Sequence, residues 1–212
     1  MQERKKRKKE LIKEKVEAKQ AKVKRLREAQ SSDKSNTIII DLEFGQLMTE
    51  SEKRSLAHQL NYCYSNNSKS EKPCKLVLCG LKDVMGQEMS NLSGFENWIV
   101  GKEEEGYIDV MSERKQDLVY LTADSENVIE KFEPSKAYII GGIVDRNRHK
   151  NVCYEKAKSQ NIATARLPIL EHMSMNSSCV LTTNCVFSII LKFQECGDWV
   201  DALSHIPGRK RG

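Results

Sequence analysis

Residues 138–150 constrain the fold more than any other part of the 212-residue chain. Their first three residues are a tyrosine and two isoleucines, which favour a buried strand, and Gly141 and Gly142 follow at once. Glycine permits a positive φ or the close approach of a ligand to the backbone. We therefore expect a strand that opens into a ligand-binding loop. The alternative is an ordinary strand exit whose charges are solvated.

Asp145 follows this strand and lies among the basic residues Arg146, Arg148, His149 and Lys150. Open α/β sheets bind ligands at the carboxyl ends of their strands, and neighbouring cations keep a carboxylate ionised. Asp145 is therefore our candidate for acid or base chemistry, whereas a lone histidine is more often structural.

The segments before and after this loop alternate between strand and helix patterns. Residues 37–42 and 75–79 read as strands, and a helix between them opens at Thr49 with Glu52 in the capping-box position. A strand, a helix and a strand in this order predict parallel pairing. Further strands are expected at 118–122, 138–142 and 162–168, helices at 126–132, 151–160, 179–193 and 198–203, and residues 107–110 are compatible with a short strand. The prediction is an α/β fold with a mainly parallel sheet.

The positive charge is concentrated at the N-terminus. Residues 1–36 hold 14 Lys and Arg against 6 Asp and Glu, so residues 37–212 carry a net charge of −3 out of a total of +5. Residues 2–30 lack Gly and Pro and have a thin apolar stripe, which favours a long helix with little to bury. We expect two parts, a basic helical extension over 1–36 and a domain over 37–212. Charge alone leaves open whether the helix is a solvated spacer or an arm that lies along phosphates.

Several classes of protein are excluded. None of the seven cysteines forms a CxxC pair, which indicates a reducing compartment and no zinc site. The apolar runs are shorter than the ~20 residues of a membrane span, and the nucleotide-binding GxGxxG pattern is absent. We expect a soluble intracellular protein, cytoplasmic, nuclear or both, that binds no metal.

Five motifs in order carry a resemblance to a known family: residues 120–125, 140–147, 165–168, 180–187 and 198–199. Together they resemble the tRNA methyltransferases that modify N1 of the purine at position 9, over about residues 37–206. The resemblance implies the SPOUT fold, with a C-terminal deep trefoil knot that holds S-adenosylmethionine in a bent shape. It implies N1-methylation of guanosine 9 in tRNA. The alternatives are adenosine 9 as the target, or a non-catalytic tRNA-binding or scaffold subunit of the same fold.

The resemblance also assigns roles to residues. Those implied to surround the cofactor are Leu121, Thr122, Gly141, Gly142, Asp145, Arg146, Asn147, Arg148, His149, Cys153, Leu167, Thr182, Thr183 and Asn184. Asp145 is implied to be the active-site carboxylate, and because guanine N1 carries a proton at neutral pH, a carboxylate is a suitable acceptor for it. Those expected to contact tRNA are Lys5, Lys6, Arg7, Lys8, Lys9, Arg146, Arg148, Lys150 and Arg166.

We expect a monomer. Residues 41–44 follow the family pattern only loosely, and residues 178–179 lack the basic residue that is common in relatives.

Overall fold

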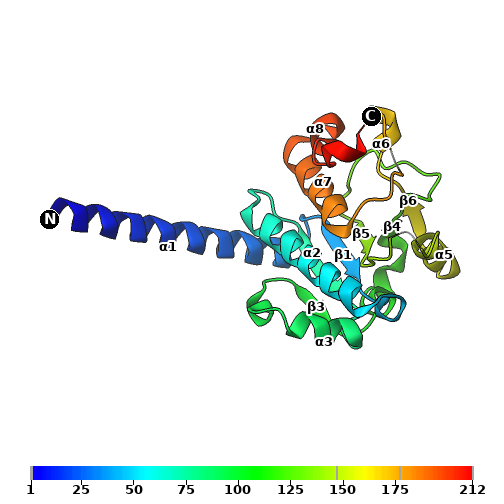
Figure 1. The fold of residues 1–212 in the computed structure, drawn as a ribbon, viewed down its shortest axis with the longest axis horizontal. Coiled ribbons are helices and arrows are strands. Elements are labelled where there is room, and N and C mark those ends of the chain that lie inside the picture. The colour runs from blue at the N-terminus through cyan, green and yellow to red at the C-terminus, as the bar shows by residue number, and fades with distance from the viewer. Residues whose placement is uncertain (1, 147, 177, 212) are drawn as a thin grey trace.

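The computed structural model describes residues 2–146, 148–176 and 178–211, and only the backbone of residues 2, 3, 5, 6 and 209. One sheet of six parallel strands has the order β3-β2-β1-β5-β4-β6 (Figure 1). The strands are β1 (Thr37–Asp41), β2 (Lys75–Cys79), β3 (Gly101–Glu103), β4 (Leu118–Leu121), β5 (Ala137–Gly141) and β6 (Ala163–Ala165). The parallel sheet expected from the sequence is thereby confirmed.

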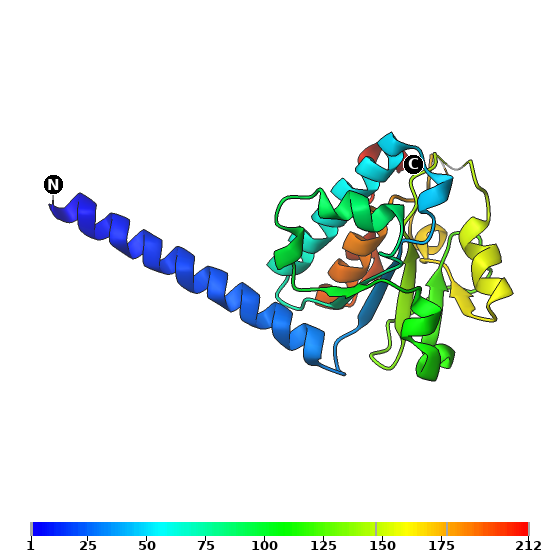
Figure 2. The same ribbon diagram turned by 90° about the horizontal axis from the view of Figure 1, so that it is seen from below.

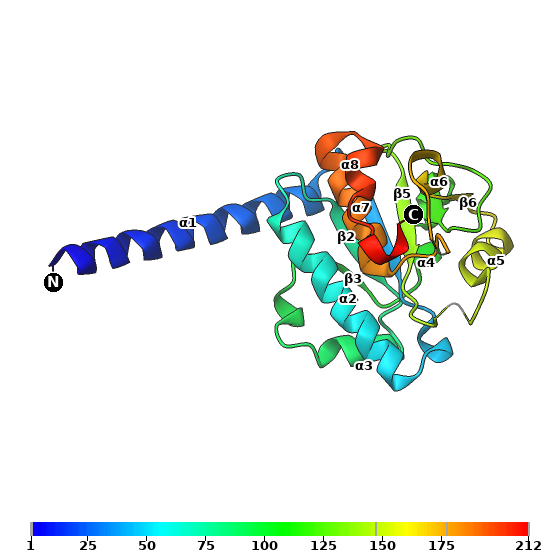
Figure 3. The same cartoon turned by 45° about the horizontal axis from the view of Figure 1, so that its top comes forward.

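Helices cover both faces of the sheet (Figures 2 and 3). They are α1 (Gln2–Ser31), α2 (Glu50–Lys69), α3 (Val84–Ser90), α4 (Tyr107–Val110), α5 (Val152–Ser159), α6 (Ile169–His172), α7 (Thr183–Cys196) and α8 (Trp199–Leu203). Alternate residues of a strand face opposite sides. Ile38 and Ile40 of β1 therefore share a core with α2, α7 and α8, whereas Ile39 packs in a second core with Tyr107 of α4 and Ala157 of α5. Within the described residues, no helix combines the length and the apolar character needed to cross a membrane.

The capping box that starts α2 is present as expected. The Thr49 hydroxyl accepts the Glu52 N–H at 3.3 Å, and Glu52 Oε2 accepts the Thr49 N–H at 2.9 Å. This reciprocal pair satisfies two backbone donors that a helix start leaves unpaired.

Three expectations about secondary structure are wrong. Residues 107–110 form the short helix α4 rather than a strand, because residues 103–105 already supply the backbone hydrogen bonds beyond the end of β2. Residues 126–132 form no helix. Their backbone instead pairs with Arg166 beside β6, and the Trp199 indole N–H donates to the Glu130 carbonyl at 2.8 Å. The closing helix, expected from residue 179, begins only at Thr183.

The long helix α1 projects from the domain over most of its length (Figure 2). Ile12 and Val16 are exposed, whereas Leu26 and Ala29 are buried. Gln30 Nε2 donates to the Leu76 carbonyl at 2.9 Å. The last two turns of α1 are therefore part of the packed structure.

Candidate functional site

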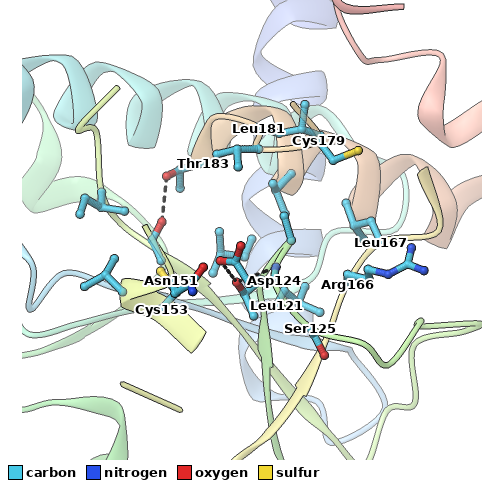
Figure 4. Close-up of a pocket in the computed structure, with 18 of the residues that line it drawn as sticks. Leu121, Asp124, Ser125, Asn151, Cys153, Arg166, Leu167, Cys179, Leu181 and Thr183 are labelled. Atoms are coloured by element: carbon cyan, nitrogen blue, oxygen red, sulfur yellow. Dashed lines mark hydrogen bonds between the residues drawn. The ribbon is translucent and has the colours of Figure 1, made fainter. Parts of the chain in front are cut away.

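A cavity of about 320 Å³ opens where β4, β5 and β6 end. The register pairs Leu121 with both Ile140 and Ala165, so these three strands end at one edge of the sheet. The loops beyond that edge and the start of α7 close around the cavity (Figure 4). Its lining consists of Leu121, Thr122, Ala123, Asp124, Ser125, Ile140, Gly141, Ile143, Asp145, His149, Asn151, Val152, Cys153, Arg166, Leu167, Ile169, Leu170, Cys179, Val180, Leu181, Thr183 and Val186.

The cavity brings together many of the side chains expected around a ligand, and leaves others outside its lining. The lining includes Leu121, Thr122, Gly141, Asp145, His149, Cys153, Leu167 and Thr183, but not Gly142, Arg146, Arg148, Thr182 and Asn184. Asn147 lies outside the described residues, as do the side chains of Lys5 and Lys6. The segment 179–181 is a wall of the cavity that the sequence does not predict, because its apolar residues are typical of the helix that follows.

Gly141 owes its place to close packing rather than to an unusual backbone angle, since its φ is not positive. A Cβ at this position would lie 2.5 Å from Cys153 Sγ. Gly142 is similar, because a Cβ there would lie 2.7 Å from the Asp41 carbonyl oxygen. The two glycines thus let the end of β5 pack directly against α5 and β1.

The helix α7 is joined to the same strand end. The Thr183 hydroxyl donates to the Gly141 carbonyl at 3.0 Å, as the dashed line in Figure 4 marks. Thr182 is the N-cap residue of α7, so it shapes the start of the helix from outside the cavity lining.

The loop after β5 holds Asp145 half-buried at the cavity. Asp145 Oδ2 accepts the His149 backbone N–H at 2.8 Å, and the Asp145 carbonyl accepts Arg148 Nε at 2.9 Å. Arg146 has a φ of 52°, an uncommon left-handed conformation for a residue other than glycine. The loop therefore has a specific turn that orients the Asp145 carboxylate.

The basic residues expected at this edge differ in their surroundings. Arg146, Arg148 and Lys150 are exposed. Arg148 Nη2 lies 2.7 Å from Glu52 Oε2, whereas Arg166 lines the cavity and makes two hydrogen bonds to Glu171. The Arg166 guanidinium holds the pKa of the Glu171 carboxyl below its usual value.

A buried charged network lies beneath the ends of β1, β4 and β5. Asp41 is fully buried, and its Oδ2 accepts the Tyr120 hydroxyl at 2.8 Å and Lys156 Nζ at 2.6 Å. Lys156 Nζ also lies 2.8 Å from Glu43 Oε2. Burial raises the pKa of Asp41, and Lys156 opposes the rise. The signal for this network was a lone aspartate closing an apolar strand, which sequence reasoning passed over.

Chemically, the cavity combines apolar walls with carboxylates at its edge. Leu121, Leu167 and Ile169 offer surfaces for a flat apolar group, and Asp124 and Asp145 offer negative charge. Such a mixture suits an amphipathic ligand of small-molecule size that carries positive charge.

Comparison with known proteins identifies the group to which the chain belongs. The sequence model of the family described as tRNA (guanine(9)-N(1))-methyltransferase TRM10/TRM10A matches residues 1–211. The chain belongs to this family. Among TRM10 relatives, rat tRNA methyltransferase 10 homolog A is 40% identical over 82% of this chain and 52% of the rat protein. The Schizosaccharomyces pombe tRNA (guanine(9)-N1)-methyltransferase is 35% identical over 99% of this chain and 71% of its own length.

The chain spans about half the length of the mammalian TRM10 relatives that it matches. A crystal structure of full-length spTrm10 in complex with SAH superposes with a TM-score of 0.76 and 36% identity, covering 82% of this chain and 95% of that one. A Trm10 from Thermococcus kodakaraensis, 23% identical, shares the fold with a TM-score of 0.63 over 81% of this chain and 99% of its own.

Proposed function

We propose that the chain is an S-adenosylmethionine-dependent methyltransferase that methylates N1 of guanosine at position 9 of tRNA. The observation that carries the proposal is the half-buried Asp145 carboxylate at the cavity, in a chain of the TRM10 family. The cofactor is supported by the related spTrm10 structure, whose ligand SAH is the product that S-adenosylmethionine becomes after methyl transfer.

The residues of the cavity fit this cofactor. Leu121, Leu167 and Ile169 suit the adenine ring. The Asp124 carboxylate complements the cationic ammonium, and the Asp145 carboxylate complements the sulfonium, a charge that SAH lacks. When bound, the cofactor supplies the methyl group. Two other residues implied by the resemblance contribute indirectly. Thr183 holds the Gly141 carbonyl by a hydrogen bond, and Cys153 packs against Gly141.

Asp145 has the role of accepting the proton from guanine N1. Its Oδ2 is oriented by the His149 backbone N–H, which fixes the carboxylate on the loop. A positioned carboxylate that removes this proton makes the ring nitrogen nucleophilic, a contribution of about 10²–10⁴-fold in rate.

The C-terminal segment is proposed to pass through a loop of the chain as the deep trefoil knot of SPOUT enzymes. The contacts that support this are local. Thr183 of α7 is hydrogen-bonded to the end of β5, and Lys210 Nζ donates to the Val180 carbonyl in the cavity wall at 2.6 Å. Both contacts hold late parts of the chain against the cavity.

The tRNA is proposed to lie along the basic extension 1–36 and across the exposed cations of the domain 37–212. Arg7, Lys8 and Lys9 are on the projecting part of α1, and Arg146 and Lys150 are exposed beside the cavity loop. Arg148 and Arg166 already have carboxylate partners in the protein, so their share in the tRNA contact is the smaller one. The protein is proposed to act as a monomer.

Incubation of the chain with methyl-labelled S-adenosylmethionine and unmodified tRNA transcripts tests the function. Matched transcripts carry guanosine, adenosine or uridine at position 9. Label confined to N1 of guanosine 9 is the expected result. Label only in the adenosine transcript would mean that the enzyme methylates adenosine 9 instead. Binding of tRNA without label in any transcript would favour a scaffold subunit.

A further inference from the structure

A second cavity, of about 400 Å³, lies where α1 joins the domain. Its walls come from the last turns of α1, the segment before β1, the segment between α2 and β2, and Gln194 of α7. This cavity lies by the amino ends of β1 and β2, whereas the cavity that contains Asp145 opens at the carboxyl ends of the strands.

Three polar atoms in the walls of this junction cavity are buried and have no hydrogen-bond partner among the described residues. They are Arg25 Nε, Asn36 Oδ1 and Gln194 Nε2, contributed by three separate parts of the chain. Buried polar groups are usually paired, because an unpaired one has lost its water without replacement. Their residues all line this cavity, so a small shift of these side chains would offer the three unpaired atoms to a polar ligand.

The chemistry of the lining selects the ligand class. Arg25 and Gln194 have N–H donors, and the lysines Lys34 and Lys72 also line the cavity. Two carboxylates also line it, those of Glu28 and Glu71, and Glu28 is within 3.9 Å of Lys24. A phosphate oxygen accepts from guanidinium and amide donors, and a ribose 2′-hydroxyl can donate to the Asn36 oxygen. RNA backbone supplies both groups together.

The position of the cavity agrees with an RNA ligand. The projecting part of α1, which holds most of the positive surplus of the chain, leads directly out of this junction (Figure 2). An RNA backbone that follows the helix would reach the junction where the helix meets the domain. A phosphate held there would also contact Lys72 of the domain, and so would fix the direction of α1.

We propose that this junction cavity binds one backbone phosphate of the tRNA, with Arg25 as its main cation and Gln194 as a neutral donor. The inference rests on the proposed function, because it takes tRNA as the partner. It adds a phosphate site at the base of the helix, separate from the edge where methyl transfer takes place.

The test compares Arg25→Gln with Arg27→Gln. Both changes remove one positive charge from the same helix two residues apart, but Arg27 is exposed and outside this cavity. Binding of full-length protein to tRNA is measured by fluorescence anisotropy over a salt series. We expect Arg25→Gln to bind about tenfold more weakly, with a slope of log affinity against log salt smaller by about 0.7–0.9. Arg27→Gln should change the affinity and the slope less than Arg25→Gln does.

Three further measurements complete the experiment. Thermal melts establish that Arg25→Gln is folded. Lys72→Gln, in the segment between α2 and β2, should lower the slope in a protein whose α1 is unaltered. A thermal shift of the wild type in inorganic phosphate that is absent in Arg25→Gln would extend the site to free phosphate. Equal slopes for Arg25→Gln and Arg27→Gln would overturn the inference and leave a water-filled junction. A wild type that binds no tRNA would overturn the proposed function as well.

Discussion

Arg148 Nη2 lies 2.7 Å from Glu52 Oε2, which joins the loop of Asp145 to the first turn of α2. The same guanidinium donates through Nε to the Asp145 carbonyl at 2.9 Å, and Glu52 also accepts the Thr49 N–H. An ion pair that is still partly exposed adds little to stability. The main effect of Arg148 is therefore to position the loop, because its side chain connects the capping residue Glu52 to the backbone of Asp145, the proposed base.

Arg148→Gln should lower the single-turnover methylation rate about tenfold at saturating tRNA, because a displaced catalytic group loses rate steeply with distance. The salt dependence of tRNA binding should change only slightly, since Arg148 has a carboxylate partner. Lys150→Gln is the matched control, an exposed cation two residues away with no carboxylate partner in the described ion pairs, and it should lower the salt slope instead. If Arg148→Gln lowered the slope and kept the rate, Arg148 would be a phosphate contact.

Asp145→Asn should retain SAH binding and lose methyl transfer by about 10²–10⁴-fold, because the amide keeps the shape of the carboxylate but accepts no proton. Calorimetry with SAH and single-turnover rates across a pH series measure the two effects. A rate equal to that of the wild type at every pH would end the assignment of Asp145 as the base.

Gly141→Ala should weaken SAH binding, because the added Cβ would lie 2.5 Å from Cys153 Sγ and must move α5 or the strand end. Gly141→Val, with a larger side chain, should weaken SAH binding further. The double variant Gly141→Ala with Cys153→Ala removes the clashing sulfur and should recover part of the binding. Gly208→Ala, where a Cβ meets nothing within 4 Å, is the control. Thermal melts without ligand separate loss of binding from loss of folding. Full affinity in Gly141→Ala would contradict the close packing at this cavity.

Lys156→Met should lower the free energy of unfolding at neutral pH by about 3–5 kcal/mol, because it leaves the buried Asp41 carboxylate without its cationic partner. Lys158→Met, an exposed lysine of the same helix, should have little effect. Urea unfolding monitored by circular dichroism measures both. An equal loss of unfolding free energy in the two variants would mean that the Asp41–Lys156 pair makes no specific contribution to stability.

The same pair predicts the direction of a pH effect. Burial raises the pKa of Asp41 above its ordinary value of 3.8, so the folded state binds the proton more tightly than the unfolded chain does. This residue therefore destabilises the fold progressively as the pH rises above about 4. Without Lys156, which lowers the pKa, the effect should extend to higher pH. The stability difference between wild type and Lys156→Met should accordingly shrink in acid.

Removal of residues 1–21 should leave a folded protein that binds SAH normally and tRNA weakly, with a smaller salt slope. The cut spares Leu26, Ala29 and Gln30, which contact the domain. Removal of residues 1–30 should destabilise the fold in addition, since truncation of a buried leucine alone costs about 2–5 kcal/mol. Anisotropy and urea unfolding distinguish the two. An equal salt slope in the shorter truncation would make the projecting helix a spacer.

The features that could be predicted from the sequence are those set by local pattern. The capping box at Thr49 and the β-branched run of β1 each depend on residues that are close in the sequence. The alternation of strand and helix patterns along the chain then implies parallel pairing. Asp145 could be singled out because a carboxylate after two glycines is conspicuous.

The features that could not be predicted depend on residues far apart in the chain. Residues 126–132 have a helical pattern, yet Trp199 and Arg166 hold their backbone extended. The partner of Arg148 is 96 residues away, and that of Asp41 is 115 residues away, so no spacing rule connects them. The start of α7 could not be predicted because residues 179–181 are apolar like the helix that follows them.

The cavity at the ends of β4, β5 and β6 is built from residues 121 to 186, in segments separated by other elements. Chains are synthesised from the N-terminus, and their early parts can fold before the rest emerges. A nascent chain that has reached β5 already has Leu121 and Gly141 but not the wall of residues 179–186. A small molecule of this cavity therefore cannot assist the early steps of folding on the ribosome. It stabilises only the finished chain, to which it adds free energy in proportion to the logarithm of its concentration.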